Sequence, residues 1–72
     1  MSGTGQHAGI VTAFDENRGL GSVSDGAGHS WPFHCTAIAD GTRSITIGTR
    51  VWFVVMAGHL GRWEAADLRA RE

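Results

Sequence analysis

AGIVTAFDENRGLGSV, residues 8–23, is the stretch that decides the fold of this 72-residue chain. Its first part is rich in the β-branched and aromatic residues that strands prefer. A polar turn at residues 15–17 separates it from a second run of the same kind. Two short strands joined by a loop that contains Asp and Asn predict a β-hairpin, with strands near residues 9–14 and 19–24.

Three further strands are predicted along the rest of the chain. Residues 29–34 form the third, and residues 50–56, RVWFVVM, form the strongest because they combine β-branched and aromatic side chains. Residues 62–68 form the fifth, although residues 65–70 also fit a helix. A single helical turn is expected at 35–39. Five short strands separated by turn residues predict an all-β fold, a small barrel.

The composition is typical of one folded domain, and the net charge predicts no general attraction to polyanions. The hydrophobic content is 42%, the net charge is −1, and all six positive charges are arginines, which suit stacking and bidentate phosphate contacts. The single cysteine, Cys35, excludes an intramolecular disulfide and favours a reducing compartment.

No signal peptide or membrane-spanning run is apparent, so we expect a cytoplasmic protein. Residues 1–8 and 69–72 are predicted to be tails on either side of a barrel at 9–68.

Several short motifs form a pattern: GIV at 9–11, FD at 14–15, RGLG at 18–21, HCTAI at 34–38 and AADL at 65–68. This pattern resembles the bacterial cold-shock domain over about residues 9–68. The resemblance implies a five-stranded antiparallel OB-type barrel. It also implies that single-stranded RNA or DNA binds across the first three strands.

Most of the stacking aromatics that the family places on this face are replaced. Ala13 takes the place of a tryptophan, Leu20 and Ser22 replace two outward aromatics of the second strand, and Thr42 replaces a loop phenylalanine. Stacking contributes about 1–3 kcal/mol per base in single-strand binders. We therefore expect weak, sequence-tolerant binding.

The candidate nucleic-acid contacts are those that keep a ring, a flat apolar side chain or a charge near this face. Stacking is expected from Phe14, His34 and Trp63, apolar contact from Leu20 and Pro32, and phosphate contact from Arg18, Arg43 and Arg62. The alternative for Trp63 is a plug at the end of the barrel, and for Arg18 and Arg43 it is solvated turn charge. Three phosphate contacts predict a shallow salt dependence, with a log–log slope of about −2.

Alternation along the strands assigns each of the other aromatic residues to the core or to the outer surface. Trp31 and Phe33 share the side opposite Pro32, so we expect them in the core. Trp52 and Val54 alternate with buried positions and are predicted to form an outward apolar stripe. That stripe suggests a protein partner or a homo-oligomer, unless the tail or a loop covers it.

Catalysis, metal binding and cofactor binding are not indicated. The spacing of His29, His34, Cys35 and His59 matches no paired zinc signature. Neighbouring residues on a strand point to opposite faces, which argues against a nucleophile pair of Cys35 with His34. Gly19-Leu20-Gly21 opens a strand rather than a helix, so it is no phosphate-binding loop.

Overall fold

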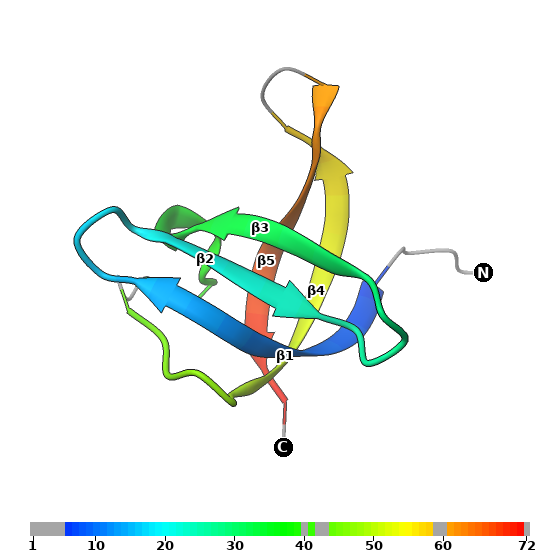
Figure 1. Ribbon diagram of the computed structural model, residues 1–72, viewed down its shortest axis with the longest axis horizontal. Coiled ribbons are helices and arrows are strands. Elements are labelled where there is room, and N and C mark those ends of the chain that lie inside the picture. The colour runs from blue at the N-terminus through cyan, green and yellow to red at the C-terminus, as the bar shows by residue number, and fades with distance from the viewer. Residues whose placement is uncertain (1–5, 40, 42–43, 59–60, 72) are drawn as a thin grey trace.

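Five antiparallel strands form one sheet in the computed structural model, which describes residues 6–39, 41, 44–58 and 61–71 (Figure 1). The elements in chain order are β1 (Gln6–Asp15), β2 (Leu20–Ser24), β3 (Ser30–His34), the 3₁₀ turn η1 (Cys35–Ala37), β4 (Arg50–Ala57) and β5 (Trp63–Ala70). The predicted all-β fold of five antiparallel strands is confirmed.

The long strand β1 curls the sheet into an OB-like barrel. The strand order is β3-β2-β1-β4-β5: the first half of β1 pairs with β4, and its second half pairs with β2. As a result β1, β2 and β3 lie in front of β4 and β5 in Figure 1. Within the described residues no ladder joins β3 to β5; a parallel bridge from Ile38 to Leu68 spans this gap instead. The Ala39 N–H also donates to the Leu68 carbonyl oxygen, at 2.8 Å.

The core lies between the two halves of the sheet. Its members are the buried apolar side chains of all five strands and of the residue after η1: Val11, Val23, Phe33, Ile38, Val51, Phe53, Ala65 and Leu68. The predicted burial of Phe33 is confirmed. Trp31 is half-buried and packs against the same cluster, with its ring centroid 5.4 Å from that of Phe53. The interior therefore accommodates two bulky rings on β3.

The strands extend further at both ends than predicted. β1 begins at Gln6, so the last three residues of the predicted tail at 1–8 pair with β4. The His7 ring stabilises this extension because it stacks on Phe53, with a centroid separation of 5.5 Å. β5 continues to Ala70, and the Arg71 N–H donates to the Arg50 carbonyl oxygen at 2.8 Å. Residues 6–8 and 69–70 of the two predicted tails thus belong to the sheet, while residues 1–5 and 72 lie outside the described residues.

A bulge in β5 explains why the end of the chain also resembled a helix. Trp52 pairs with Arg69 but Val54 pairs with Ala66, so β5 has one extra residue in this interval. Asp67, in this interval, has a φ of 54°, in the left-handed region. Because of the extra residue, Ala65 and Leu68 are both buried although they are three positions apart. That spacing is typical of a helix face, but here it comes from a bulged strand.

Candidate nucleic-acid interface

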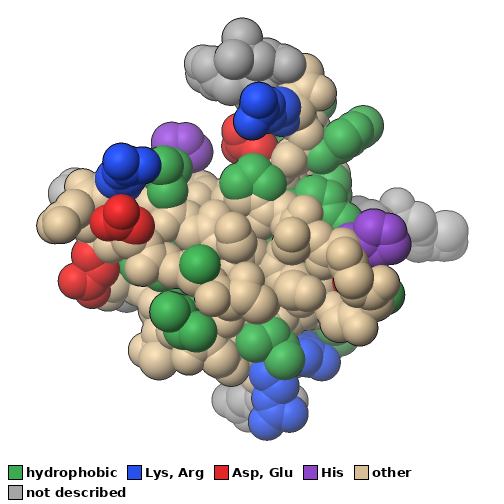
Figure 2. Space-filling model, viewed as in Figure 1, with side chains coloured by type: hydrophobic (Ala, Val, Ile, Leu, Met, Phe, Trp, Pro, Cys, Tyr) green, Lys and Arg blue, Asp and Glu red, His purple; other side chains and the backbone are tan. Residues whose placement is uncertain are grey.

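The outward side chains of β1, β2 and β3 form two rows of directly opposed residues, which we call the three-strand face. Ala13, Ser22 and Pro32 form one row, and Asp15, Leu20 and His34 form the other. Figure 2 views this side of the molecule, where hydrophobic side chains appear as separate patches. The two rows bring three of the predicted contact residues, Leu20, Pro32 and His34, onto one surface.

Exposure of these three side chains follows from strand alternation. Pro32 and His34 flank the buried Phe33, and Leu20 stands directly opposite His34. Leu20 is 38% exposed, and Pro32 and His34 are exposed as well. β3 is an edge strand of the sheet, so the missing N–H of Pro32 breaks no ladder. The two rows thus hold three apolar side chains, one hydroxyl, one imidazole and one carboxylate, that of Asp15.

Phe14, from which stacking on a base is expected, lies on the inner side of β1 and not in either row of the three-strand face. A bulge in β1 between Val11 and Ala13 turns Phe14 to the inner side, together with Val11. The Phe14 ring is half-buried and stacks on Phe33, with a centroid separation of 6.0 Å and an interplanar angle of 14°. Its remaining exposed edge lines an open hollow beside Ile45 and Ile47. Phe14 is therefore part of the packing beneath the three-strand face.

Arg18 lies at the end of the three-strand face, in the turn between β1 and β2. Its Nε is 3.9 Å from the Asp15 carboxylate, and its side chain is 76% exposed. The same carboxylate accepts hydrogen bonds from the N–H groups of Asn17 and Arg18, at 3.0 and 3.3 Å. With Glu16 also in this turn, the end of the face carries more negative than positive charge. A phosphate would meet little net attraction there.

The remaining predicted contacts lie apart from this surface or outside the described residues. Arg62 and Trp63 belong to the β4–β5 hairpin, which projects past β3 in Figure 1. Trp63 is 61% exposed and pairs with Ala57, so it does not plug the barrel. Arg43 lies outside the described residues.

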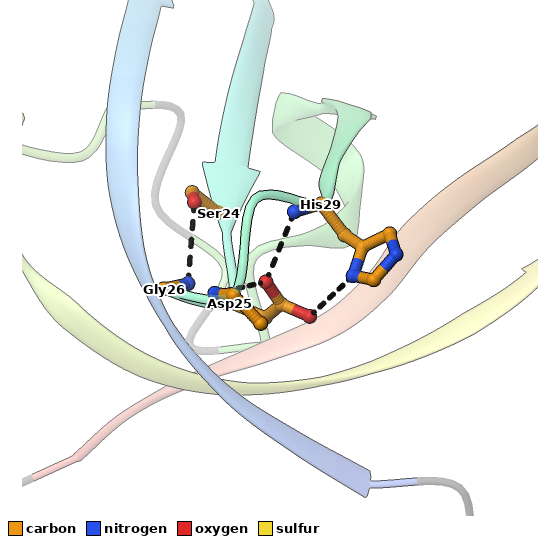
Figure 3. A network of polar contacts seen from close by, with 5 residues as sticks. Ser24, Asp25, Gly26 and His29 are labelled. Carbon is orange, nitrogen blue, oxygen red and sulfur yellow. Dashed lines mark hydrogen bonds and ion pairs between the residues drawn. The ribbon is translucent and has the colours of Figure 1, made fainter.

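A polar network orders the turn between β2 and β3, at the opposite end of the face (Figure 3). One oxygen of the Asp25 carboxylate accepts hydrogen bonds from the N–H groups of Ala27 and His29, at 2.8 and 3.2 Å. The other oxygen lies 3.3 Å from His29 Nδ1. The Gly26 N–H donates to Ser24 Oγ at 3.3 Å. The hydrogen bonds to the Asp25 carboxylate, above all that from the Ala27 N–H, hold the pKa of Asp25 below its ordinary value.

The lowered pKa of Asp25 gives a first prediction. An NMR titration of its carboxyl carbon should show a midpoint below that of an ordinary aspartate. In the control variant His29→Ala the midpoint should stay low, because the backbone N–H of Ala27 is the largest cause. Since the folded state binds the proton more weakly, the stability due to this carboxylate should be present at neutral pH and lost as the pH falls through the folded value. A midpoint at or above the ordinary value would contradict this.

A second cluster, which the sequence reading did not identify, surrounds Trp52 on the outer side of β4 and β5. Trp52 is 39% exposed, and its ring lies under Arg71, whose Cζ is 5.5 Å from the ring centroid. Arg69 is directly opposite Trp52, and Arg50 is two residues before it on β4. Val54, by contrast, is half-buried. The sequence signal for this cluster was the alternation of RVW at residues 50–52 and of RAR at residues 69–71. Only the pairing of β4 with β5 brings these two segments together.

Other kinds of site receive no support within the part of the chain that the structure describes. Those residues contain no group of three or more His, Cys, Asp or Glu side chains arranged to hold a metal ion. They also contain no helix of the length and hydrophobicity needed to cross a membrane.

No protein-family model matches the chain, and no match was found among curated proteins.

Proposed function

We propose that this protein binds single-stranded RNA or DNA weakly and with little sequence preference, through the three-strand face. One observation carries the proposal: Leu20, Pro32 and His34 are exposed side by side on β2 and β3. The resemblance to the cold-shock domain supports the same ligand and the same face. The absence of a disulfide partner for Cys35 fits action in the reducing cytoplasm.

The chemistry of the face accounts for the proposed weakness. The imidazole of His34 can stack on a base or donate a hydrogen bond to it, while Leu20 and Pro32 offer apolar contact without a π system. Asp15 stands in the same row as His34 and repels phosphate. Few cations lie at this surface, so binding should weaken only gently with salt.

Replacement of His34 tests the proposal. His34→Ala should weaken the binding of a labelled single strand about fivefold, the lower end of what one stacking contact contributes. His29→Ala is the matched control, because it removes an exposed imidazole in the turn before β3, outside both rows. Fluorescence anisotropy with the label on the oligonucleotide measures both affinities. Equal affinities for the wild type and His34→Ala would remove the three-strand face from the proposed site.

A second candidate is a protein partner or a second copy of the chain at Trp52 and Val54. The exposed side chains of Trp52 and Met56, at 39% and 52%, favour it. Two features of this surface work against a symmetric dimer centred on Trp52. Val54 is half-buried, and three arginines around Trp52 would approach their own copies across a twofold axis. We therefore rank nucleic-acid binding first.

A further inference from the structure

Three of the five described arginines surround one tryptophan, and we call Arg50, Trp52, Arg69 and Arg71 the basic patch. Arg50 and Trp52 share a side of β4 because they are two residues apart. Arg69 is opposite Trp52, and Arg71 follows two residues later, directly after the end of β5. The Arg71 N–H bonds to the Arg50 carbonyl oxygen, which places these two residues opposite each other. Figure 2 shows cationic side chains gathered at the lower edge, near the C-terminal end in Figure 1.

The charge of the basic patch is incompletely balanced by described residues. Arg69 Nε is 3.1 Å from the Asp67 carboxylate. Arg50 and Arg71 have no ion pair among the described residues, and Arg71 Nε is enclosed without a hydrogen-bond partner there. Like charges directly opposite each other on neighbouring strands destabilise a sheet. A chain of net charge −1 thus concentrates positive charge at one place, where a polyanion would relieve the repulsion.

The basic patch is continuous with the three-strand face. Ile10 pairs with Ser24 of β2 on one side and with Arg50 of β4 on the other. Ser24 in turn pairs with Ser30 of β3, so one row of outward residues crosses from β3 to β4. Ile10 is 43% exposed at the middle of this row. Among the described residues, this row gives an extended ligand on the three-strand face a direct path to Arg50.

We propose that the basic patch is the principal phosphate-binding surface for single-stranded nucleic acid. The guanidinium groups of Arg50 and Arg71 would contact phosphate oxygens, and a base would stack on the exposed part of the Trp52 ring. Planar guanidinium groups match phosphate bidentately, and Trp and Arg both stack on bases. An acidic peptide would use the charges but not the exposed ring, so the combination favours a nucleic acid. The ligand class rests on the proposed function, whereas the surface is new.

The test uses two double variants that remove equal charge from the intact chain. Arg50→Gln/Arg71→Gln should weaken oligonucleotide binding at least tenfold and make the log–log salt slope shallower by about 1.4, the value for two phosphates. In the control, Arg18→Gln/Arg62→Gln, the loss of binding affinity and the change in salt slope should each be less than half as large. Thermal unfolding of each variant verifies that the fold is retained. As a second readout, the Trp52 indole N–H resonance, assigned with Trp52→Phe, should shift when oligonucleotide is added to the wild type.

The outcomes separate this inference from the proposed function. Unchanged affinity and slope in Arg50→Gln/Arg71→Gln, with weakened binding in His34→Ala, would overturn the basic patch and leave the three-strand face. The reverse result would support the basic patch and remove the three-strand face. Absence of any binding by the wild type would overturn both. Binding of poly-glutamate as tight as that of an oligonucleotide of equal charge, with the same shift at Trp52, would identify an acidic protein as the ligand class instead.

Discussion

Replacing Gly21 with alanine should destabilise the protein by about 3 kcal/mol or more, the upper end of the effect of overpacking. A Cβ at this position would lie 2.6 Å from the Ala13 carbonyl oxygen and 2.6 Å from Phe33 Cζ. It would also lie 2.9 Å from Phe14 Cδ1. The stacked rings of Phe14 and Phe33 occupy the space where a side chain of residue 21 would project. The absence of a side chain at Gly21 is therefore a condition for this packing beneath the three-strand face.

Chemical denaturation measures the effect of Gly21→Ala, with Ser22→Ala as the neighbouring control on the outward side of β2. The control should change the free energy of unfolding by less than about 1 kcal/mol. The double variant Gly21→Ala/Phe33→Leu should destabilise less than the sum of its single changes, because the smaller side chain relieves one close contact. The contact with the Ala13 backbone would remain, so the rescue should be partial. A Gly21→Ala protein as stable as Ser22→Ala would show that the rings are not packed as described.

Phe33→Ala should have one of the largest effects of any single truncation, a loss of about 3–5 kcal/mol. The Phe33 side chain is 1% exposed and packs in the centre of the core beside Phe14. A domain of this size has a total stability on the order of 4–11 kcal/mol, from about 0.05–0.15 kcal/mol per residue. The variant should therefore lose between about a quarter and all of the free energy of unfolding, as measured by circular dichroism and denaturant titration.

Trp63→Ala is the matched control for Phe33→Ala, since it also truncates an aromatic residue in a strand. Trp63 is 61% exposed, so its removal should change the stability by less than about 1 kcal/mol. The comparison separates burial from the mere loss of an aromatic ring. Similar losses in both variants would contradict the assignment of Phe33 to the core and of Trp63 to the surface.

The sequence predicts the strands and the core well because buried and exposed side chains alternate along most of the strands. Phe33 is buried between exposed Pro32 and His34, as period-two alternation requires. Alternation fails at the two bulges, where one extra residue reverses the side of every later position in the strand. The bulge in β1 turns Phe14 inward, and the bulge in β5 buries Ala65 and Leu68 together.

The candidate site was predictable only where the strands that carry it pair in a regular register, without a bulge. Leu20 and His34 come together through the pairing of β2 with β3, which are neighbours in the chain. The basic patch depends on the register of β4 with β5, including the bulge at Asp67, which pairs Trp52 with Arg69. No local pattern specifies that register. The side chains of the basic patch therefore form a cluster that the pattern of neither strand predicts by itself.

The central claim, that this protein binds single-stranded nucleic acid, is tested most directly by titrating the wild type into end-labelled single strands. Pyrimidine-rich and mixed strands of about 7–12 nucleotides should be compared at low and moderate salt. We predict micromolar or tighter binding at low salt, similar for both sequences, that weakens as salt is added. No binding of either strand at low salt would contradict the account.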